Sequence, residues 1–180
     1  MRVYCDTDTL FSNIKRHESQ PSVKKELEAL KKLLVYHSGK KIVMFRSLGN
    51  LRELEKTKNL RQLKKLCSDY ESLPPLPKDE RHYGSDTLIT EPYGGCISNP
   101  LVSDVQDEAI CAELENRGLK RPDAQHVTQA VCNGCDIFMT RDEKSIIRPH
   151  RAWIETRFCP IKVCLPSQAL AEVKSRFGPI

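Results

Sequence analysis

Residues 123–142 of the chain read DAQHVTQAVCNGCDIFMTRD and carry the signals of a helix, a turn and a strand in succession. Four apolar residues recur at the spacing of one helical face, namely Ala124, Val127, Ala130 and Val131. Asn133 and Gly134 end that helix, because both tolerate the left-handed backbone of a helix C-terminus. The apolar run 137–139 then has the length of a short buried strand. This succession predicts one unit of an α/β fold.

Acidic residues stand at both ends of this unit. Asp123 is expected to start the helix, and Thr140 and Asp142 follow the strand. A second apolar strand, at 2–5, is also followed directly by an acid, Asp6. Open α/β sheets bind their ligands at the carboxyl ends of the strands. We therefore expect these acids, far apart in sequence, to converge on one site.

The remaining apolar patterns alternate between helices and short strands. Helices are expected at about 22–37, at 48–54 after a capping Ser47, from 103–104 to 118, and from 166 onward. Further strands are expected at 41–45 and 161–165. One helical turn is expected at 143–147, and Trp153 is expected in a polar loop.

This order of elements predicts a three-layer α/β sandwich with a mostly parallel central sheet. A chain of 180 residues fits a single domain spanning residues 1–180. The stretch at about 72–102 is rich in proline, glycine and polar residues, and we expect an irregular loop insertion there.

Basic residues are in modest excess, with a net charge of +5 and a pI of about 8.8. The densest run lies between 52 and 65 and comprises Arg52, Lys56, Lys58, Arg61, Lys64 and Lys65. Such a run suits contact with a phosphate backbone, and it equally suits a solvated helix face. The charge alone leaves both interpretations open.

The 8 cysteines are expected to be reduced thiols of a cytoplasmic protein. Arg2 and Asp6 interrupt any apolar start, so no signal peptide is expected, and no window has the length of a membrane span. Cys132 and Cys135 form one C-x-x-C pair, which a zinc site would need Cys159 and Cys164 to complete. A lone C-x-x-C is weak evidence for such a site.

Four acids form the predicted constellation: Asp6, Glu53, Asp123 and Asp142. Packed carboxylates repel one another unless a cation neutralises them. Mg²⁺ prefers oxygen ligands, usually one or two carboxylates together with water and substrate phosphates. Each aspartate taken singly is equally explained as a turn former or a helix cap. The combination is what favours a site.

Four segments together resemble the PIN-domain family, which includes the RNA-cutting toxins of the VapC type. In chain order they are VYCDTDTL at 3–10, RSLGNLREL at 46–54, the block at 123–142, and IKVCLPSQAL at 161–170. The third segment is similar to the family's most recognisable block, an Asp-led helix followed by a strand and Thr-x-Asp. Asp8 stands where the family usually has Asn.

The resemblance implies a PIN-like fold and a divalent-metal-dependent ribonuclease, with cleavage inside the RNA chain favoured. It implies Asp6, Asp123 and Asp142 as ligands of Mg²⁺ or Mn²⁺, with Glu53 completing the acidic cluster. Thr140 would orient the site beside Asp142, and Asp8 would likewise contact substrate or orient the site. RNA is the implied partner, with an inhibitor or antitoxin protein and a homodimer left open. The long insertion weakens a toxin role in particular.

Two other functions remain open from the sequence. A PIN-like fold also serves as a non-catalytic RNA-binding or assembly module. A haloacid-dehalogenase-like phosphatase would use Asp6 as nucleophile and Asp8 as acid/base, although the glycine usual after the second aspartate is missing. His126 lies three residues after Asp123 on the same helix face, and a structural or peripheral role is favoured for it.

Overall fold

The computed structural model of the chain describes residues 1–11, 21–55, 71–78, 82–90, 95–103 and 107–179. Its centre is a four-stranded sheet in which all neighbouring strands are parallel. The strands are β1 (Arg2–Cys5), β2 (Val43–Phe45), β5 (Ile137–Met139) and β6 (Lys162–Cys164), and their order across the sheet is β2-β1-β5-β6. The predicted α/β class with a parallel central sheet is therefore confirmed.

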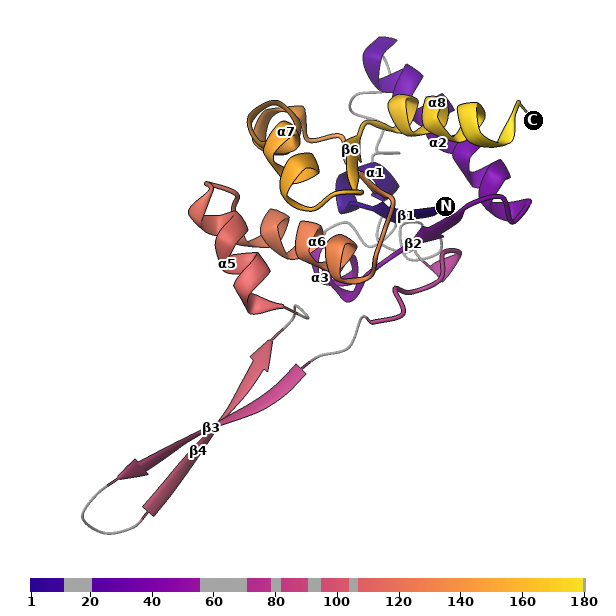
Figure 1. The fold of residues 1–180 in the computed structure, drawn as a ribbon. Coiled ribbons are helices and arrows are strands. Elements are labelled where there is room, and N and C mark those ends of the chain that lie inside the picture. The colour runs from indigo at the N-terminus through magenta and orange to yellow at the C-terminus, as the bar shows by residue number, and fades with distance from the viewer. Residues whose placement is uncertain (12–20, 56–70, 79–81, 91–94, 104–106, 180) are drawn as a thin grey trace.

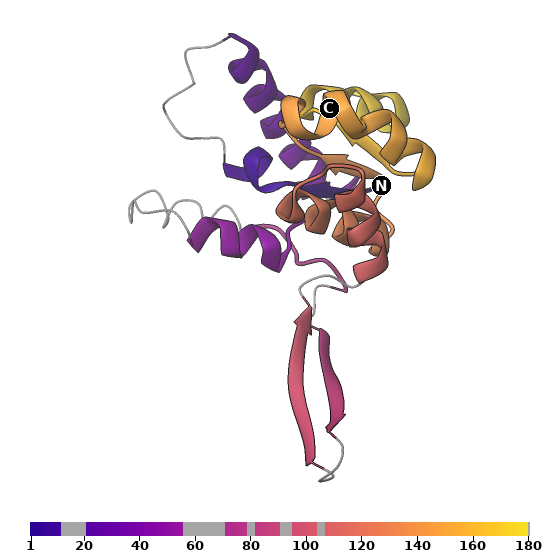
Figure 2. The same ribbon diagram turned by 90° about the vertical axis from the view of Figure 1, so that its left-hand side faces the viewer.

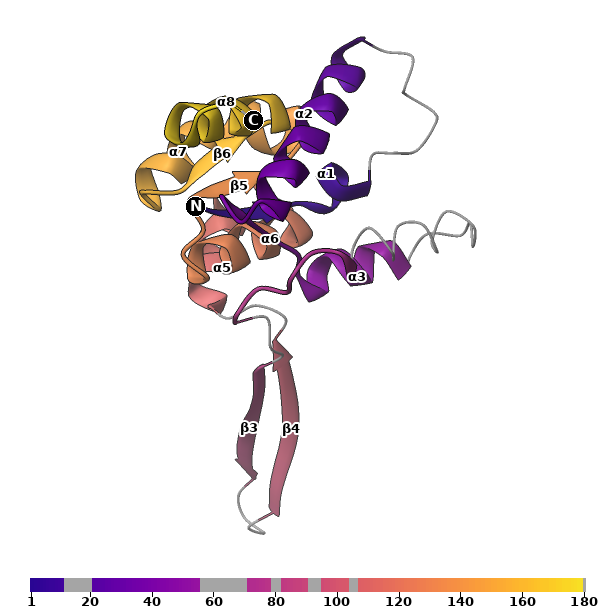
Figure 3. The ribbon, with the colours of Figure 1, turned by 90° about the vertical axis from the view of Figure 1, so that its right-hand side faces the viewer.

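Helices cover both faces of this sheet (Figures 1 and 3). On one face, α2 (Pro21–Ser38) and α8 (Pro166–Phe177) pack on each other and on the sheet. On the other face lie α5 (Glu108–Asn116) and α6 (Arg121–Cys132). The helix α7 (Arg148–Arg157) lies beside β6, where the Glu155 carboxylate accepts a hydrogen bond from the Val163 backbone N–H. These are the three layers expected from the sequence.

Successive side chains of β1 point to opposite faces of the sheet, so the strand contributes to a hydrophobic core on each face. Val3 and Cys5 point toward α2 and α8, where they join Leu33, whereas Tyr4 points toward α6 and Phe138. All of these residues are fully buried. A strand buried on both faces must be apolar at consecutive positions, which is why these strands read as continuous hydrophobic runs.

Three short elements follow the carboxyl ends of the strands. The helix α1 (Thr7–Phe11) follows β1, α3 (Leu48–Glu55) follows β2, and the π-helical turn η1 (Glu143–Ile147) follows β5 and continues into α7. Ser47 caps α3 as predicted: its hydroxyl accepts a hydrogen bond from the Asn50 N–H at 3.3 Å. The same edge of the sheet therefore carries several helix starts.

The predicted irregular insertion at 72–102 is wrong for most of its length. Strands β3 (His82–Thr90) and β4 (Gly95–Ser103) pair antiparallel, as a two-stranded ribbon that extends away from the α/β body (Figures 1 and 2). In the register of the pair, Leu88 is opposite Ile97. The prediction was based on the glycines and prolines of this stretch, and it missed the antiparallel pairing of the two strands.

Two other expectations about helices are corrected. The helix expected from 103–104 begins at Glu108, because the Asp107 side chain accepts hydrogen bonds from the N–H groups of Ala109 and Ile110. Trp153 lies in α7, where its ring packs edge-on against Phe158.

The basic run from 56 to 65 lies outside the described residues. None of the described helices combines the length and the apolar character needed to cross a membrane.

Candidate functional site

The candidate site lies where the strand order changes direction. The chain passes from β1 to β2 on one side and later returns to β5 on the other side of β1. Ligand sites of open α/β sheets form at this switch point, outside the carboxyl ends of the strands. Asp6 follows β1 and Thr140 follows β5, so the two lie side by side at this edge.

Asp6 is fixed on both of its carboxylate oxygens. The Thr140 hydroxyl donates to Oδ2 at 2.6 Å, and the Thr7 backbone N–H donates to Oδ1 at 2.7 Å. The Asp6 side chain is almost entirely buried. Burial raises its pKa, although these two donors and His126 favour the charged form. Asp6 is therefore a pre-positioned acid with spare oxygen lone pairs at a sheet edge.

Asp142 is held by the turn that it starts. Its N–H donates to the Thr140 hydroxyl at 3.1 Å, and its own Oδ1 accepts from the Ser145 N–H at 2.7 Å. Thr140 therefore contacts both strand-end acids, as expected for a site-orienting residue. Because its side chain accepts from the Ser145 N–H, Asp142 also has an ordinary structural role as the N-cap of the turn.

Asp123 lies in the first turn of α6, which begins two residues before it. The expectation that Asp123 starts the helix is thus corrected by two residues, with Lys120 in the cap position. Burial and the charges of Asp6 and Asp142 raise the pKa of Asp123 to about 6. The helix brings this acid to the same edge as the strand-end acids, because α6 runs opposite to the strands.

Asp8 lies at the exposed rim of this cluster. Partial burial, followed by the charges of Asp6 and Asp142, raises its pKa, and the neighbouring Arg141 opposes that shift. The carboxylates of α1, β1, α6 and the β5 end therefore all lie within one another's electrostatic field. This convergence joins segments more than a hundred residues apart.

Glu53 reaches the cluster from α3 and contacts His126. The Oε1 atom of Glu53 lies 3.5 Å from His126 Nε2, and Asp6 Oδ1 lies 3.9 Å from the same nitrogen. His126 is buried, with 4% of its surface exposed. The expectation of a structural or peripheral role for His126 did not foresee this central position between two acids. The i, i+3 spacing from Asp123 was the available signal.

A divalent cation fits the donor chemistry of this site. Asp6, Asp123 and Asp142 offer only oxygen ligands, and the repulsion that raises the pKa of Asp123 would be relieved by a cation. Within the described part of the chain, no three His, Cys, Asp or Glu side chains already surround one point closely enough to hold an ion. Binding therefore requires at least one of these carboxylates to turn toward the others.

The cysteines do not form a zinc site in the described structure. Cys135 and Cys164 are buried, Cys132 is half-buried and Cys159 is exposed, and all four are free thiols. Among the described residues, no three His, Cys, Asp or Glu side chains, these cysteines included, are grouped closely enough to hold a metal ion. Burial raises the pKa of Cys135 to about 12 and that of Cys164 to about 11.

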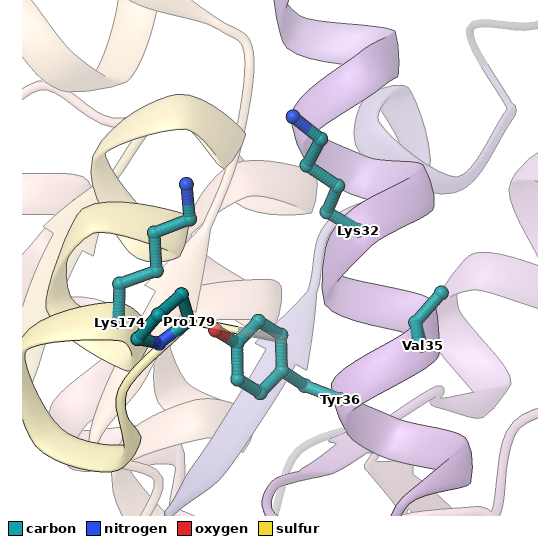
Figure 4. A pocket seen from close by; sticks show the side chains of 5 residues that line it. All are labelled: Lys32, Val35, Tyr36, Lys174 and Pro179. Carbon is teal, nitrogen blue, oxygen red and sulfur yellow. The ribbon is translucent and has the colours of Figure 1, made fainter.

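A separate cavity of about 200 Å³ lies between α2 and the end of α8 (Figure 4). Its lining comprises Lys32, Val35, Tyr36, Lys174 and Pro179. The last turn of α2 directly precedes β2, so this cavity lies toward the amino ends of the strands. It is not part of the acidic site.

The fold and this edge define a parallel α/β protein with a carboxylate cluster at the topological switch point. No protein-family model, no curated protein and no solved structure matches the chain.

Proposed function

We propose that this protein is a divalent-metal-dependent ribonuclease that hydrolyses RNA phosphodiester bonds at the acidic cluster. The observation that carries the proposal is the convergence of Asp6, Glu53, Asp123 and Asp142, from four separate segments, at the carboxyl edge of a parallel sheet. The resemblance of the segments around these acids to PIN-domain nucleases supports the same activity. Mg²⁺ or Mn²⁺ is the proposed cofactor.

The roles of the residues follow from their contacts. Asp6, Asp123 and Asp142 would hold the cation, which when bound supplies Lewis acidity toward the phosphoryl oxygens and lowers the pKa of water. Thr140 holds the Asp6 carboxylate and the Asp142 backbone in fixed positions. This restraint keeps two of the acids ordered before substrate arrives, which reduces the reorganisation needed for catalysis.

RNA as substrate is supported by charge around the site. Arg141 follows β5 and lies close enough to Asp8 to oppose the rise in its pKa. The sequence also carries a basic run at 56–65, which suits contact with a phosphate backbone. A basic side chain such as Arg141 can contact RNA phosphates while the carboxylates remain available to the metal ion.

The test is hydrolysis of a mixture of structured and single-stranded RNA in Mg²⁺, in Mn²⁺ and in EDTA. The wild type is compared with Asp123→Asn and with Glu28→Gln, a matched loss of one carboxylate at an exposed position of α2. We expect metal-dependent cleavage by the wild type and the Glu28 variant, and a loss of at least a hundredfold in Asp123→Asn.

Two results would replace the proposal. Binding of RNA without cleavage in either metal would indicate a non-catalytic RNA-binding module. Hydrolysis of a small phosphate monoester, with RNA left intact and Asp6 essential, would indicate a phosphatase in which Asp6 is the nucleophile. An equal rate for Asp123→Asn and the wild type would show that cleavage comes from a contaminant or from another site.

A further inference from the structure

His126 is surrounded by polar groups although it is buried. Its Nε2 atom lies 3.5 Å from Glu53 Oε1, 3.9 Å from Asp6 Oδ1 and 3.4 Å from Thr7 Oγ1. Its Nδ1 atom lies on the other side of the ring and is hydrogen-bonded to the Tyr4 hydroxyl. Both ring nitrogens are therefore engaged, and Glu53 and Asp6 lie on the Nε2 side.

The Tyr4 side of the ring belongs to a buried chain of hydrogen bonds. The Tyr4 hydroxyl also contacts Ser47 Oγ at 2.7 Å, and the Ser47 N–H donates to Asn50 Oδ1 at 2.7 Å. Asn50 Nδ2 in turn donates to Thr7 Oγ1 at 2.9 Å, beside the Nε2 atom of His126. These hydrogen bonds form a closed circuit that contacts the imidazole on both sides. The circuit links β1, α1, α3 and α6.

This arrangement determines which nitrogen carries the proton. A bare Nε2 would direct its lone pair at the oxygens of Glu53 and Asp6, which is repulsive. In the neutral ring, Nε2–H therefore faces the acids and Nδ1 accepts from the Tyr4 hydroxyl. In the charged ring, Nδ1–H donates to Tyr4, whose hydroxyl then donates to Ser47. The Nε2 atom carries a proton in both forms.

The packing around the ring leaves no spare space on the α3 side. A Cβ atom built at Gly49 would lie 3.1 Å from His126 Cε1 and 3.3 Å from Ser47 Oγ, which is tighter than ordinary van der Waals contact. Glycine at this position lets α3 approach the ring closely enough for Glu53, one turn later, to reach Nε2.

We propose that His126 is the positioning residue of the acidic site: its Nε2 atom faces Glu53 at 3.5 Å and Asp6 at 3.9 Å, so that Glu53 acts through His126 and not as a direct ligand of the cation. This inference rests on the proposed metal-dependent function. Asp6, Asp123 and Asp142 would then hold the cation, and His126 would keep Asp6 and Glu53 in place beside it.

The first experiment measures the ring itself and does not depend on nuclease activity. Nitrogen-15 NMR of the histidine rings, with His126 assigned by its absence in His126→Gln, reports which nitrogen is protonated. We expect a proton on Nε2, a changed Nε2 resonance in Glu53→Ala, and an unchanged one in Asp142→Asn. A neutral ring protonated on Nδ1, or a spectrum that Glu53→Ala leaves unchanged, would overturn the proposal.

The second experiment is a double-mutant cycle on Mn²⁺ affinity, measured by calorimetry. Loss of a residue that orients a ligand typically weakens metal binding by about 10- to 100-fold. We expect His126→Ala and Glu53→Ala each to fall in this range, and the double variant to bind no more than about 3-fold more weakly than the weaker single variant. His126→Gln, which keeps an N–H donor, should recover part of the affinity.

Two controls separate positioning from simple loss of fold. Thermal unfolding of each variant shows whether it is folded, and Gly49→Ala displaces the ring without removing any polar group, so it should weaken Mn²⁺ binding in the same direction. If the losses of His126→Ala and Glu53→Ala multiply, Glu53 is an independent ligand and the proposal is wrong. If wild type shows the expected NMR and Mn²⁺ results but cuts no RNA, the positioning role of His126 stands and the ribonuclease proposal fails.

Discussion

Replacing Asp123 with asparagine is expected to stabilise the protein in the absence of divalent cations. The pKa of Asp123 rises from 3.8 to about 6 because of burial and the charges of Asp6 and Asp142. At about 1.4 kcal/mol per pKa unit, this corresponds to about 3 kcal/mol of unfavourable free energy at neutral pH. Asp123 is only half-buried, so solvent screening reduces the figure to about 1–1.5 kcal/mol. Asparagine has nearly the same shape as aspartate but carries no charge, so this unfavourable free energy is absent from the variant.

The sign of the pH dependence follows from the raised pKa. Asp123 binds its proton more tightly in the folded than in the unfolded chain, so this contribution to stability is complete below pH 4 and is lost as the pH rises through about 6. The advantage of Asp123→Asn should therefore be near zero at pH 4 and complete at pH 7.5. A chain of 180 residues gains about 2–4 °C per kcal/mol, which predicts a Tm increase of about 2–6 °C.

The assay is thermal unfolding in EDTA across this pH range, with Glu28→Gln as the control for loss of a carboxylate outside the cluster. Added Mg²⁺ should make the wild type more stable than Asp123→Asn. A ligand at a hundred times its Kd adds about 2.7 kcal/mol to the free energy of unfolding of the protein that binds it. A variant that is no more stable than wild type at pH 7.5 in EDTA would refute the account of mutual repulsion. An equal gain at pH 4 would refute its electrostatic origin.

Three further predictions test other parts of the structure. Thr140→Val, which removes the 2.6 Å hydrogen bond to Asp6, should weaken Mn²⁺ binding about 10- to 100-fold in calorimetry, and Thr140→Ser should restore it. Replacing residues 79–106 with a short glycine-serine linker should leave the Tm within about 3 °C of wild type, because among the described strands β3 and β4 pair only with each other. A collapse of the folded state would show that the ribbon supports the core. Brief alkylation of the native protein followed by peptide mass spectrometry should label the exposed Cys159 and spare Cys5, whose pKa burial raises strongly; labelling of Cys5 at the same rate would contradict its placement in the core.

The parallel sheet was predictable because its signals are local. The run at 137–139 is apolar at every position, and Asn133-Gly134 separates it from the preceding helix at the point where the structure ends that helix. The short strands could be recognised without their neighbours, since a strand buried on both faces needs no alternation. The same locality explains why Asp6 and Asp142 could be placed at strand ends.

The ribbon and α7 were not predictable in the same way. Pairing of β3 with β4 depends on register across a turn, as where Thr87 is opposite Ser98, and no single strand carries an unambiguous signal of it. Trp153 lies among charged residues, so α7 reads as a polar loop until Ile154 is seen to be buried against the core. Tertiary contacts decided both elements.

The centre of the acidic site also depended on contacts that sequence spacing does not contain. Tyr4 lies in an apolar strand and reads as a core residue, and Ser47 reads as a helix cap. Both roles are correct, and the Tyr4 hydroxyl is also hydrogen-bonded to Ser47 Oγ and to the ring of His126, 122 residues from Tyr4. A residue can therefore satisfy its local pattern completely and still belong to a site.

Asp123 gives the strongest reason to regard the cluster as functional and not merely as a set of capping residues. An aspartate in the first turn of a helix normally gains stability from the helix dipole, which favours its charged form. Asp142 is explained in part by such a local role, since it accepts from the Ser145 N–H. For Asp123 the balance is reversed: burial and the charges of Asp6 and Asp142 raise its pKa to about 6 in spite of the dipole. A first-turn carboxylate whose charged form its surroundings disfavour is what the proposed cation site would produce, because a bound cation would relieve the repulsion between Asp123 and the neighbouring acids.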